Sequence, residues 1–286
     1  MSNRAIGILH PGEMGISIAA SAKNSGCDVY WVSQGRRSAT RERAAKFGLH
    51  EVRTLEELFK HCAVVVSVCP PHAAEALAQD VVNAGFHGLF VEGNAIAPDR
   101  TIKIGEMMTK ADVSFVDGGI IGLPAWKPHS TCLYVSGPRA EELTPYFSAG
   151  PLDTKVLGTE IGKASALKMC YAANTKGTVA LLAAILATAE GLGVREALFD
   201  RWRSEDAGLP DQVFKRIQMN APKAWRFVGE MGEISHTFTL AGSPGEFHIG
   251  AADIYQRLAE FKDTQTPPTL EQILDALCAS KKETIK

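Results

Sequence analysis

The sequence predicts an α/β domain with a doubly wound, mainly parallel sheet, followed by an all-α domain, with a long interdomain helix joining the two. Two observations predict this organisation. Short apolar runs alternate with helix-like stretches over residues 1–160, and the later segment is rich in alanine and leucine with few strand formers in a row. We therefore expect one domain over residues 1–160 and an all-α domain over residues 161–286.

The apolar runs of the first half have the length and composition of buried strands. The run AVVVSV at residues 63–68 shows no polar alternation, which is typical of a sheet covered on both faces. The expected strands are Ala5–Leu9, Asp28–Val32, Ala63–Val68, Leu89–Glu92, Ser114–Asp117 and Cys132–Ser136. The expected helices between them are Gly15–Lys23, Ala39–Phe47, His72–Ala84 and Asp99–Lys110. This alternation indicates βαβ units, with or without a nucleotide site.

The segment from Gly162 to Glu190 predicts the interdomain helix. A helix of this length would span roughly 43 Å at 1.5 Å per residue. Because it is apolar on most faces, it must be buried by other helices or by a second subunit, so we expect a homodimer. Beyond Arg195, amphipathic helical runs alternate with Gly and Pro breaks, which indicates further helices.

Composition narrows the classes of partner. The formal net charge of −2 gives no field that would gather nucleic acid or an anionic membrane, so a small-molecule substrate is expected. The 6 cysteines form no CxxC pair and are expected to be reduced, with no metal site. The N-terminus enters a strand pattern directly, without a signal-peptide pattern, so a cytoplasmic location is expected.

The first expected strand runs into the segment His10-Pro11-Gly12-Glu13-Met14-Gly15. Glycine lets a backbone approach a pyrophosphate, and a helix N-terminus offers free N–H groups to it. His10 replaces the first glycine of the usual G-x-G-x-x-G pattern, but the segment lies at the first strand-to-helix turn, as in a Rossmann domain. We interpret it as a dinucleotide site, with His10, Pro11, Gly12, Glu13 and Met14 as cofactor-binding residues; a purely structural tight turn is the alternative.

The residues after the second expected strand, Ser33 to Ser38, predict cofactor preference. An acidic residue that would bind the ribose 2′-hydroxyl of NAD is missing from this segment. Ser33, Arg36 and Arg37 can instead bind a 2′-phosphate, so NADP (NADPH) is the preferred cofactor, with NAD as the other candidate. Alternatively, the arginines open a solvated helix.

Five segments together resemble the β-hydroxyacid dehydrogenase superfamily, which includes hydroxyisobutyrate and 6-phosphogluconate dehydrogenases and the imine reductases. They are Ile6–Gly15, Ser67–Pro70, Glu92–Pro98, Asp117–Gly122 and Gly162–Met169. The C-terminal half is similar to a phosphogluconate-dehydrogenase-like branch. The resemblance implies that Cys69, Pro70 and Asn94 flank the nicotinamide end of the cofactor.

The resemblance also implies that Lys168 is the catalytic residue. A lysine on an apolar helix must lose its charge, pair with an acidic group or take part in catalysis, because an isolated buried ammonium is costly. A lowered pKa would let Lys168 exchange a proton with a substrate hydroxyl. The family asparagine at i+4 is Ala172 here, so Tyr171, at i+3, is expected to take over its hydrogen bond to the substrate. Lys176 is expected to be solvated.

The substrate loop departs from the family pattern. Where the family has Ser-Gly-Gly, this chain has Ile121-Gly122-Leu123, and isoleucine cannot donate a hydrogen bond to a substrate carboxylate. We predict that these residues and His236 contact the substrate. The expected activity is that of an NAD(P)-dependent oxidoreductase acting on a small hydroxy compound; the alternatives are an imine reductase and a non-catalytic nucleotide-binding regulatory protein.

Overall fold

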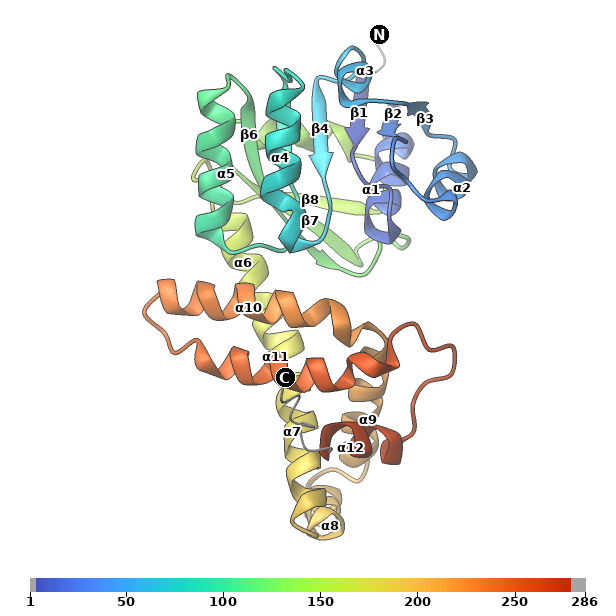
Figure 1. Cartoon of the computed structure of the whole chain (residues 1–286), viewed down its shortest axis with the longest axis vertical. Helices are drawn as coiled ribbons and strands as arrows, with labels where there is room; N and C mark the ends of the chain where they lie inside the picture. Colours follow the sequence, from blue (N-terminus) through green and yellow to red (C-terminus); the bar gives the residue numbers. More distant parts are fainter. Residues whose placement is uncertain (1–3, 279–286) are drawn as a thin grey trace, which may run out of the picture. The chain divides into compact units, whose positions relative to one another are not determined.

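The structure, a computed structural model, describes residues 4–278. The chain divides into two compact units, Met1–Met169 and Cys170–Lys286. Figure 1 shows a sheet with helices in the first unit and helices alone in the second. The predicted fold class, an α/β domain followed by an all-α domain, is confirmed.

The first unit is built on one sheet with the strand order β3-β2-β1-β4-β5-β6-β7-β8. The strands are β1 (Arg4–Ile8), β2 (Cys27–Val32), β3 (His50–Val52), β4 (Val64–Ser67), β5 (Leu89–Glu92), β6 (Ser114–Gly122), β7 (Thr131–Ser136) and β8 (Leu152–Val156). Strands β6 and β7 are antiparallel, and the other neighbours are parallel. The chain order reverses between β1 and β4, and ligands of such sheets bind outside the carboxyl ends of the strands at this reversal.

Helices cover both faces of the sheet. They are α1 (Glu13–Asn24), α2 (Ser38–Lys46), α3 (Leu55–Phe59), α4 (Ala74–Asn83) and α5 (Pro98–Lys110), with α4 and α5 drawn in front of the sheet in Figure 1. Val64 and Val66 belong to one core cluster and Val65 to another. Because successive strand residues point to opposite faces, both faces of β4 are buried, as the run AVVVSV predicts.

Two strands and one α-helix of the first unit were not predicted, namely β3, β8 and α3. Strand β3 has only 3 residues, of which none is buried. Helix α3 begins with a cap that the sequence does contain, since the Thr54 side chain accepts a hydrogen bond from the Glu57 N–H at 3.3 Å. Strand β6 continues to Gly122, so Ile121 and Gly122 end a strand and do not lie in a loop.

The predicted long helix extends from Lys163 to Gly191. It consists of α6 (Lys163–Ala172), a π-helical turn over Ala173–Gly177 and α7 (Thr178–Gly191). The π-helical turn means that regular α-helical spacing holds only as far as Ala172. By length and composition alone, this helix could cross a membrane, but core helices of soluble proteins have the same properties.

The second unit is helical, as predicted. After α7 come α8 (Arg195–Glu205), α9 (Leu209–Asn220), α10 (Ala224–Leu240), α11 (Glu246–Leu258) and α12 (Leu270–Cys278).

Candidate functional site

The turn between β1 and α1 keeps the two glycines that matter for its geometry. The Gly12 N–H donates to the His10 carbonyl oxygen at 2.8 Å, which closes the turn. A Cβ at Gly15 would lie 2.0 Å from that same oxygen, so only glycine fits there, whereas a Cβ at Gly12 would meet nothing within 4 Å. Gly12 is the N-cap of α1 without a side-chain cap, and Glu13 and Met14 are its first residues. The first N–H groups of α1 are therefore open to an anion.

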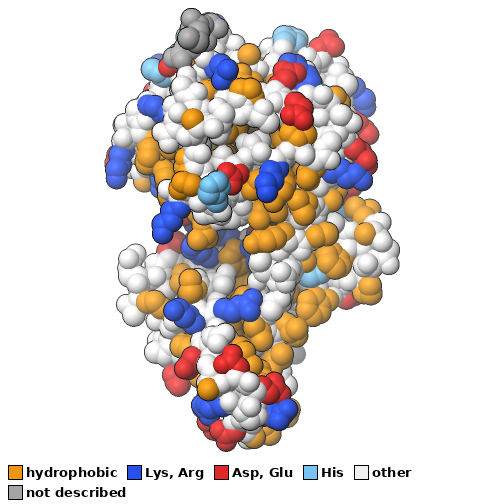
Figure 2. Space-filling model, turned by 180° about the vertical axis from the view of Figure 1, so that it is seen from behind, with side chains coloured by type: hydrophobic (Ala, Val, Ile, Leu, Met, Phe, Trp, Pro, Cys, Tyr) orange, Lys and Arg blue, Asp and Glu red, His pale blue; other side chains and the backbone are white. Residues whose placement is uncertain are grey.

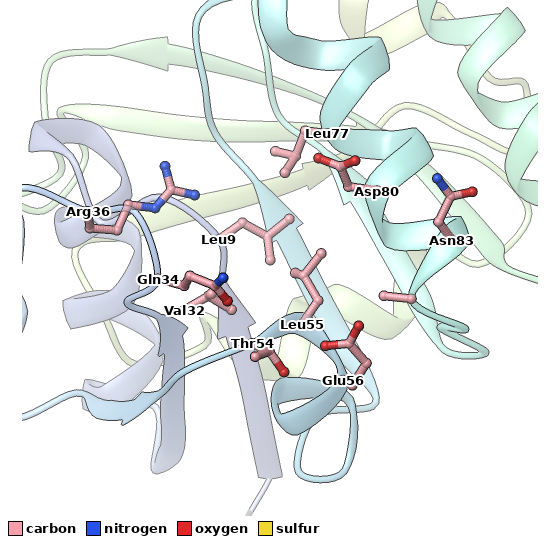
Figure 3. Close-up of a pocket in the computed structure, with 11 residues that line it drawn as sticks. Leu9, Val32, Gln34, Arg36, Thr54, Leu55, Glu56, Leu77, Asp80 and Asn83 are labelled. Atoms are coloured by element: carbon pink, nitrogen blue, oxygen red, sulfur yellow. The ribbon is translucent and has the colours of Figure 1, made fainter.

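A cavity of about 500 Å³ lies beside this turn, where the order of the strands reverses. It is lined by Leu9, Val32, Gln34, Arg36, Thr54, Leu55, Glu56, Leu77, Asp80, Asn83 and Ala84. Figure 3 shows Arg36 on one side of the cavity and Asp80 and Asn83, from α4, on the other. Apolar walls with a few polar groups at the rim are typical of small-molecule sites.

The arginines after β2 divide into three kinds. Arg36 is half-buried and lines the cavity, and its Nε is buried without a hydrogen-bond partner among the described residues. Arg37 is exposed at the N-cap of α2. Arg41 binds Glu51 at 2.5 Å and the carbonyl oxygen of Ser33 at 2.8 Å, so it has a structural role. Arg36 is therefore the arginine best placed to meet a ligand in the cavity.

The predicted residues at the ends of β4 and β5 are held to each other. The Cys69 N–H donates to Asn94 Oδ1, and Asn94 Nδ2 donates to Ser67 Oγ at 3.0 Å. Burial raises the pKa of the Cys69 thiol to about 12, so the thiol stays protonated. Pro70 follows at the start of a 3₁₀ turn. Asn94 thus fixes the Cys69–Pro70 segment, and direct contact of these residues with a cofactor stays a prediction.

A row of four buried polar residues crosses the sheet next to this segment. Ser67, Glu92, Asp117 and Ser136 are paired in register across β4, β5, β6 and β7, and each is fully buried. Glu92 Oε1 accepts from the Asn94 N–H at 2.9 Å, while Oε2 is buried without a partner among the described residues. Burial and the neighbouring Asp117 raise the pKa of Glu92 to about 8, so it is protonated at neutral pH.

Asp117 caps the helix that carries Lys168. Its Oδ2 accepts hydrogen bonds from the N–H groups of Gly162, Ala164 and Ser165 at 2.9, 3.0 and 3.1 Å, and its Oδ1 accepts from Ser165 Oγ at 2.5 Å. Burial raises the pKa of Asp117, and these hydrogen bonds act in the opposite direction. Sequence reasoning missed this role, because the cap lies 45 residues before Gly162.

Strand β6 also sets where Lys168 lies. A Cβ at Gly119 would be 2.5 Å from the carbonyl oxygen of Ala164 and 3.2 Å from Lys168 Cβ, so only a glycine lets α6 pack this closely on β6. Ile121 and Gly122 end the same strand, and Leu123 follows with 71% of its surface exposed. The structure therefore brings Lys168 next to the strand that carries two of the four predicted substrate residues, Ile121 and Gly122.

The remaining predicted residues belong to the second unit. Tyr171 is 45% exposed on α6, and His236 is exposed on α10. The expectation of a solvated Lys176 is wrong: Lys176 Nζ binds Glu230 Oε1 at 2.6 Å, and the two side chains are only 16% and 11% exposed. Tyr255 donates to the carbonyl oxygen of Lys176 at 2.8 Å, within the π-helical turn.

The sheet order, the glycine turn and the cavity define a dinucleotide-binding domain of the Rossmann type. Residues 5–148 match the model of the NAD binding domain of 6-phosphogluconate dehydrogenase, and the chain belongs to this family. Residues 189–258 match a domain of unknown function, DUF1932. An uncharacterised 28.5 kDa protein from Methanothermus fervidus is 28% identical over 195 residues, which are 68% of this chain and 74% of that protein.

Three solved structures share the fold of this chain. The conserved protein MTH1747, described as of unknown function and similar to 3-hydroxyacid dehydrogenases, is 28% identical with a TM-score of 0.66, covering 90% of this chain and 98% of that one. The 3-hydroxyisobutyrate dehydrogenase of Mycobacterium tuberculosis is 18% identical with a TM-score of 0.70, covering 97% and 100%. An imine reductase from Myxococcus stipitatus in complex with NADP⁺ is 21% identical with a TM-score of 0.55, covering 90% and 93%. The family match and the shared fold together support an oxidoreductase with an NAD binding domain of the 6-phosphogluconate dehydrogenase type.

Proposed function

We propose that the protein is an NADP(H)-preferring oxidoreductase that acts on a small hydroxy compound, with Lys168 as general acid/base. The observation that carries the proposal is the cavity beside the glycine turn, with Arg36 on its wall. The expected cytoplasmic location and the prediction that the chain binds neither nucleic acid nor a membrane belong to this proposal.

The residues present fit a dinucleotide. The space over Gly12 and the N-terminus of α1 suit a pyrophosphate. Arg36 Nε, which has no hydrogen-bond partner within residues 4–278, suits an anionic group. Residues 33–38 contain no carboxylate that would repel a 2′-phosphate. A bound nicotinamide dinucleotide would supply or accept the hydride.

Lys168 would move the proton. Its stem lies against Gly119, and Asp117 holds the start of its helix through hydrogen bonds. In the oxidative direction, the neutral amine takes the proton of the substrate hydroxyl as the carbonyl forms; in the reductive direction, the ammonium returns it. Ile121 offers no hydrogen bond, so a substrate with an apolar substituent near the reacting carbon suits this strand end.

Imine reduction is the second candidate. Ile121 favours it, because an imine substrate does not need the carboxylate contact that a serine would provide. Lys168 favours the hydroxy compound, since a proton must leave a hydroxyl when the carbonyl forms. A regulatory protein that binds the nucleotide without turnover is the third outcome, which the lack of an asparagine at position 172 favours.

The first experiment is calorimetric titration with NADPH and NADH, followed by absorbance assays with hydroxy acids, aryl alcohols, ketones and cyclic imines. We expect tighter binding of NADPH and turnover of a hydroxy compound or its ketone. Turnover of imines alone would favour the second candidate, and nucleotide binding without turnover of any compound would favour the regulator. Binding of neither nucleotide would overturn the proposal.

Lys168→Ala tests the catalytic role. We expect turnover to fall about 100-fold or more, with nearly unchanged NADPH affinity, because a general acid/base is lost. Lys163→Ala is the matched control, since Lys163 lies on the same helix, is 53% exposed and pairs with Glu160 at 3.2 Å. Unchanged turnover in Lys168→Ala would remove Lys168 from the mechanism.

We also propose that the chain is a homodimer through its helical unit. Figure 2 shows extensive hydrophobic surface on this unit. Exposed hydrophobic residues of this unit include Leu181, Leu240, Phe247 and Ile249, which are 44% to 56% exposed. Exposed apolar area of this kind is typical of a protein interface. Sedimentation equilibrium should give twice the chain mass of 30.7 kDa, and a monomer would contradict the proposal.

A further inference from the structure

The position of His10 raises a question that the glycine pattern leaves open. His10 stands where the dinucleotide fingerprint normally has its first glycine, yet the turn around it is intact, with the Gly12 N–H bonded to the His10 carbonyl oxygen at 2.8 Å. Its imidazole is partly buried, and its Nδ1 is fully buried without a hydrogen-bond partner among the described residues. An unpartnered buried nitrogen is costly and calls for an explanation, such as a ligand that completes it.

Arg36 has the same property and lies on the neighbouring strand. Strands β1 and β2 pair in parallel, with Gly7 opposite Tyr30, so the segments that follow them emerge side by side. His10 follows β1, and Arg36 follows β2. Arg36 Nε is also buried without a partner among residues 4–278, and Arg36 lines the 500 Å³ cavity together with Leu9, the residue before His10. Two buried nitrogens without partners among the described residues, His10 Nδ1 and Arg36 Nε, therefore lie at the same edge of the sheet, beside one cavity.

The charge state of His10 is consistent with a shared ligand. Burial and the positive charge of Arg36 lower the pKa of His10 to about 4, so the imidazole is neutral at neutral pH. A neutral imidazole still has one N–H donor, and it avoids placing a second positive charge beside Arg36 in the free protein. A phosphate group could accept from both side chains.

We propose that His10 and Arg36 form one recognition site for the 2′-phosphate of the adenosine ribose, so that the histidine in the fingerprint determines cofactor specificity. This inference rests on the proposed dinucleotide function and adds to it. Arg36 supplies the charge, and His10 supplies a donor from the glycine turn itself. His10 makes the fingerprint depart from its usual glycine pattern, and the same residue increases the preference for NADPH over NADH.

His10→Gly, which restores the usual fingerprint, tests the proposal. If His10 only disturbs the turn, this variant binds NADPH and NADH more tightly than the wild type. If His10 binds the 2′-phosphate, calorimetry should show NADPH affinity about 10- to 100-fold lower, the range for a hydrogen bond to a charged group, with little change for NADH. His10→Gln keeps a side-chain N–H donor and should recover part of the loss.

Two further variants make the test specific. The double variant His10→Gly/Arg36→Ala should lose less NADPH affinity than the sum of the two single losses, because both residues bind one group. His87→Gly is the matched control, since His87 is exposed just before β5, at the amino ends of the parallel strands, whereas His10 and Arg36 follow the carboxyl ends. Thermal melting of each variant checks that the fold is retained.

The outcomes separate this inference from the proposed function. Wild-type protein that binds neither nucleotide would overturn both. Wild-type protein that binds NADPH, with His10→Gly binding it equally or more tightly, would overturn the role of His10 alone. Equal losses for NADPH and NADH would overturn the assignment to the 2′-phosphate.

Discussion

Replacement of Asp117 should show that one side chain of the sheet holds the start of the catalytic helix. In Asp117→Ala, the N–H groups of Gly162 and Ser165 lose a buried acceptor, and Ser165 Oγ loses one of its two partners but keeps Thr101 Oγ1 at 2.8 Å. The Ala164 N–H keeps Ser136 Oγ at 3.1 Å. Asp117→Asn, by contrast, keeps one oxygen that can accept from the N–H groups, but its amide nitrogen cannot accept the hydrogen bond that Ser165 Oγ donates to Asp117 Oδ1.

The magnitude follows from these contacts. Each buried donor left without an acceptor costs about 1–3 kcal/mol, so two N–H groups cost about 2–6 kcal/mol. Because the variant no longer buries a carboxyl group, part of this cost is offset, and we expect about 3–4 kcal/mol for Asp117→Ala and about 1–2 kcal/mol for Asp117→Asn.

Urea unfolding followed by circular dichroism measures these differences, and hydrogen exchange over residues 162–169 locates them. Asp153→Ala is the control, because Asp153 is 38% exposed and pairs with His129 at 3.2 Å, so its loss should cost less than about 1 kcal/mol. An Asp117→Ala protein within about 1 kcal/mol of the wild type, or with unchanged exchange at the start of α6, would refute the capping role.

Further variants test three separate features. Gly15→Ala should lower the melting temperature, because its Cβ would lie 2.0 Å from a backbone oxygen. Gly12→Ala should leave the melting temperature unchanged but weaken NADPH binding in calorimetry. Equal melting temperatures of the two variants would contradict this distinction. Between the ordinary pKa of 4.5 and about 8, Glu92 keeps its proton only in the folded state, so stability should fall as pH rises, by up to about 1.4 kcal/mol per pH unit. In urea unfolding, Glu92→Gln should lack this fall in stability with rising pH. A pH dependence of stability equal to that of the wild type would exclude a raised pKa of Glu92 as its cause. Glu230→Ala, which leaves Lys176 buried and unpaired, should cost about 3–5 kcal/mol in urea unfolding, and the double variant Lys176→Met/Glu230→Leu much less; similar losses would argue against a buried pair.

The residues of the candidate site could be predicted in part. The glycine turn and Lys168 could be predicted because each belongs to a local pattern that one sequence shows. A strand followed by glycines and a helix is defined by neighbouring residues. Which arginine lines the cavity was not predictable, since Arg36, Arg37 and Arg41 are close in sequence but differ in burial and partners. Contacts between segments far apart in the chain produce no regular residue spacing in the sequence, so a sequence pattern does not reveal them.

The sequence by itself determined the alternation of the longer strands and helices, the glycine turn and the family resemblance, because periodicity and turn chemistry are local. It did not reveal the 3-residue strand β3, which is too short for a pattern. Only the tertiary structure decided that Asp117 caps α6, that Glu92 holds a proton and that Lys176 is paired with Glu230. These properties depend on burial and on distances between residues far apart in the chain, and both exist only once the chain has folded.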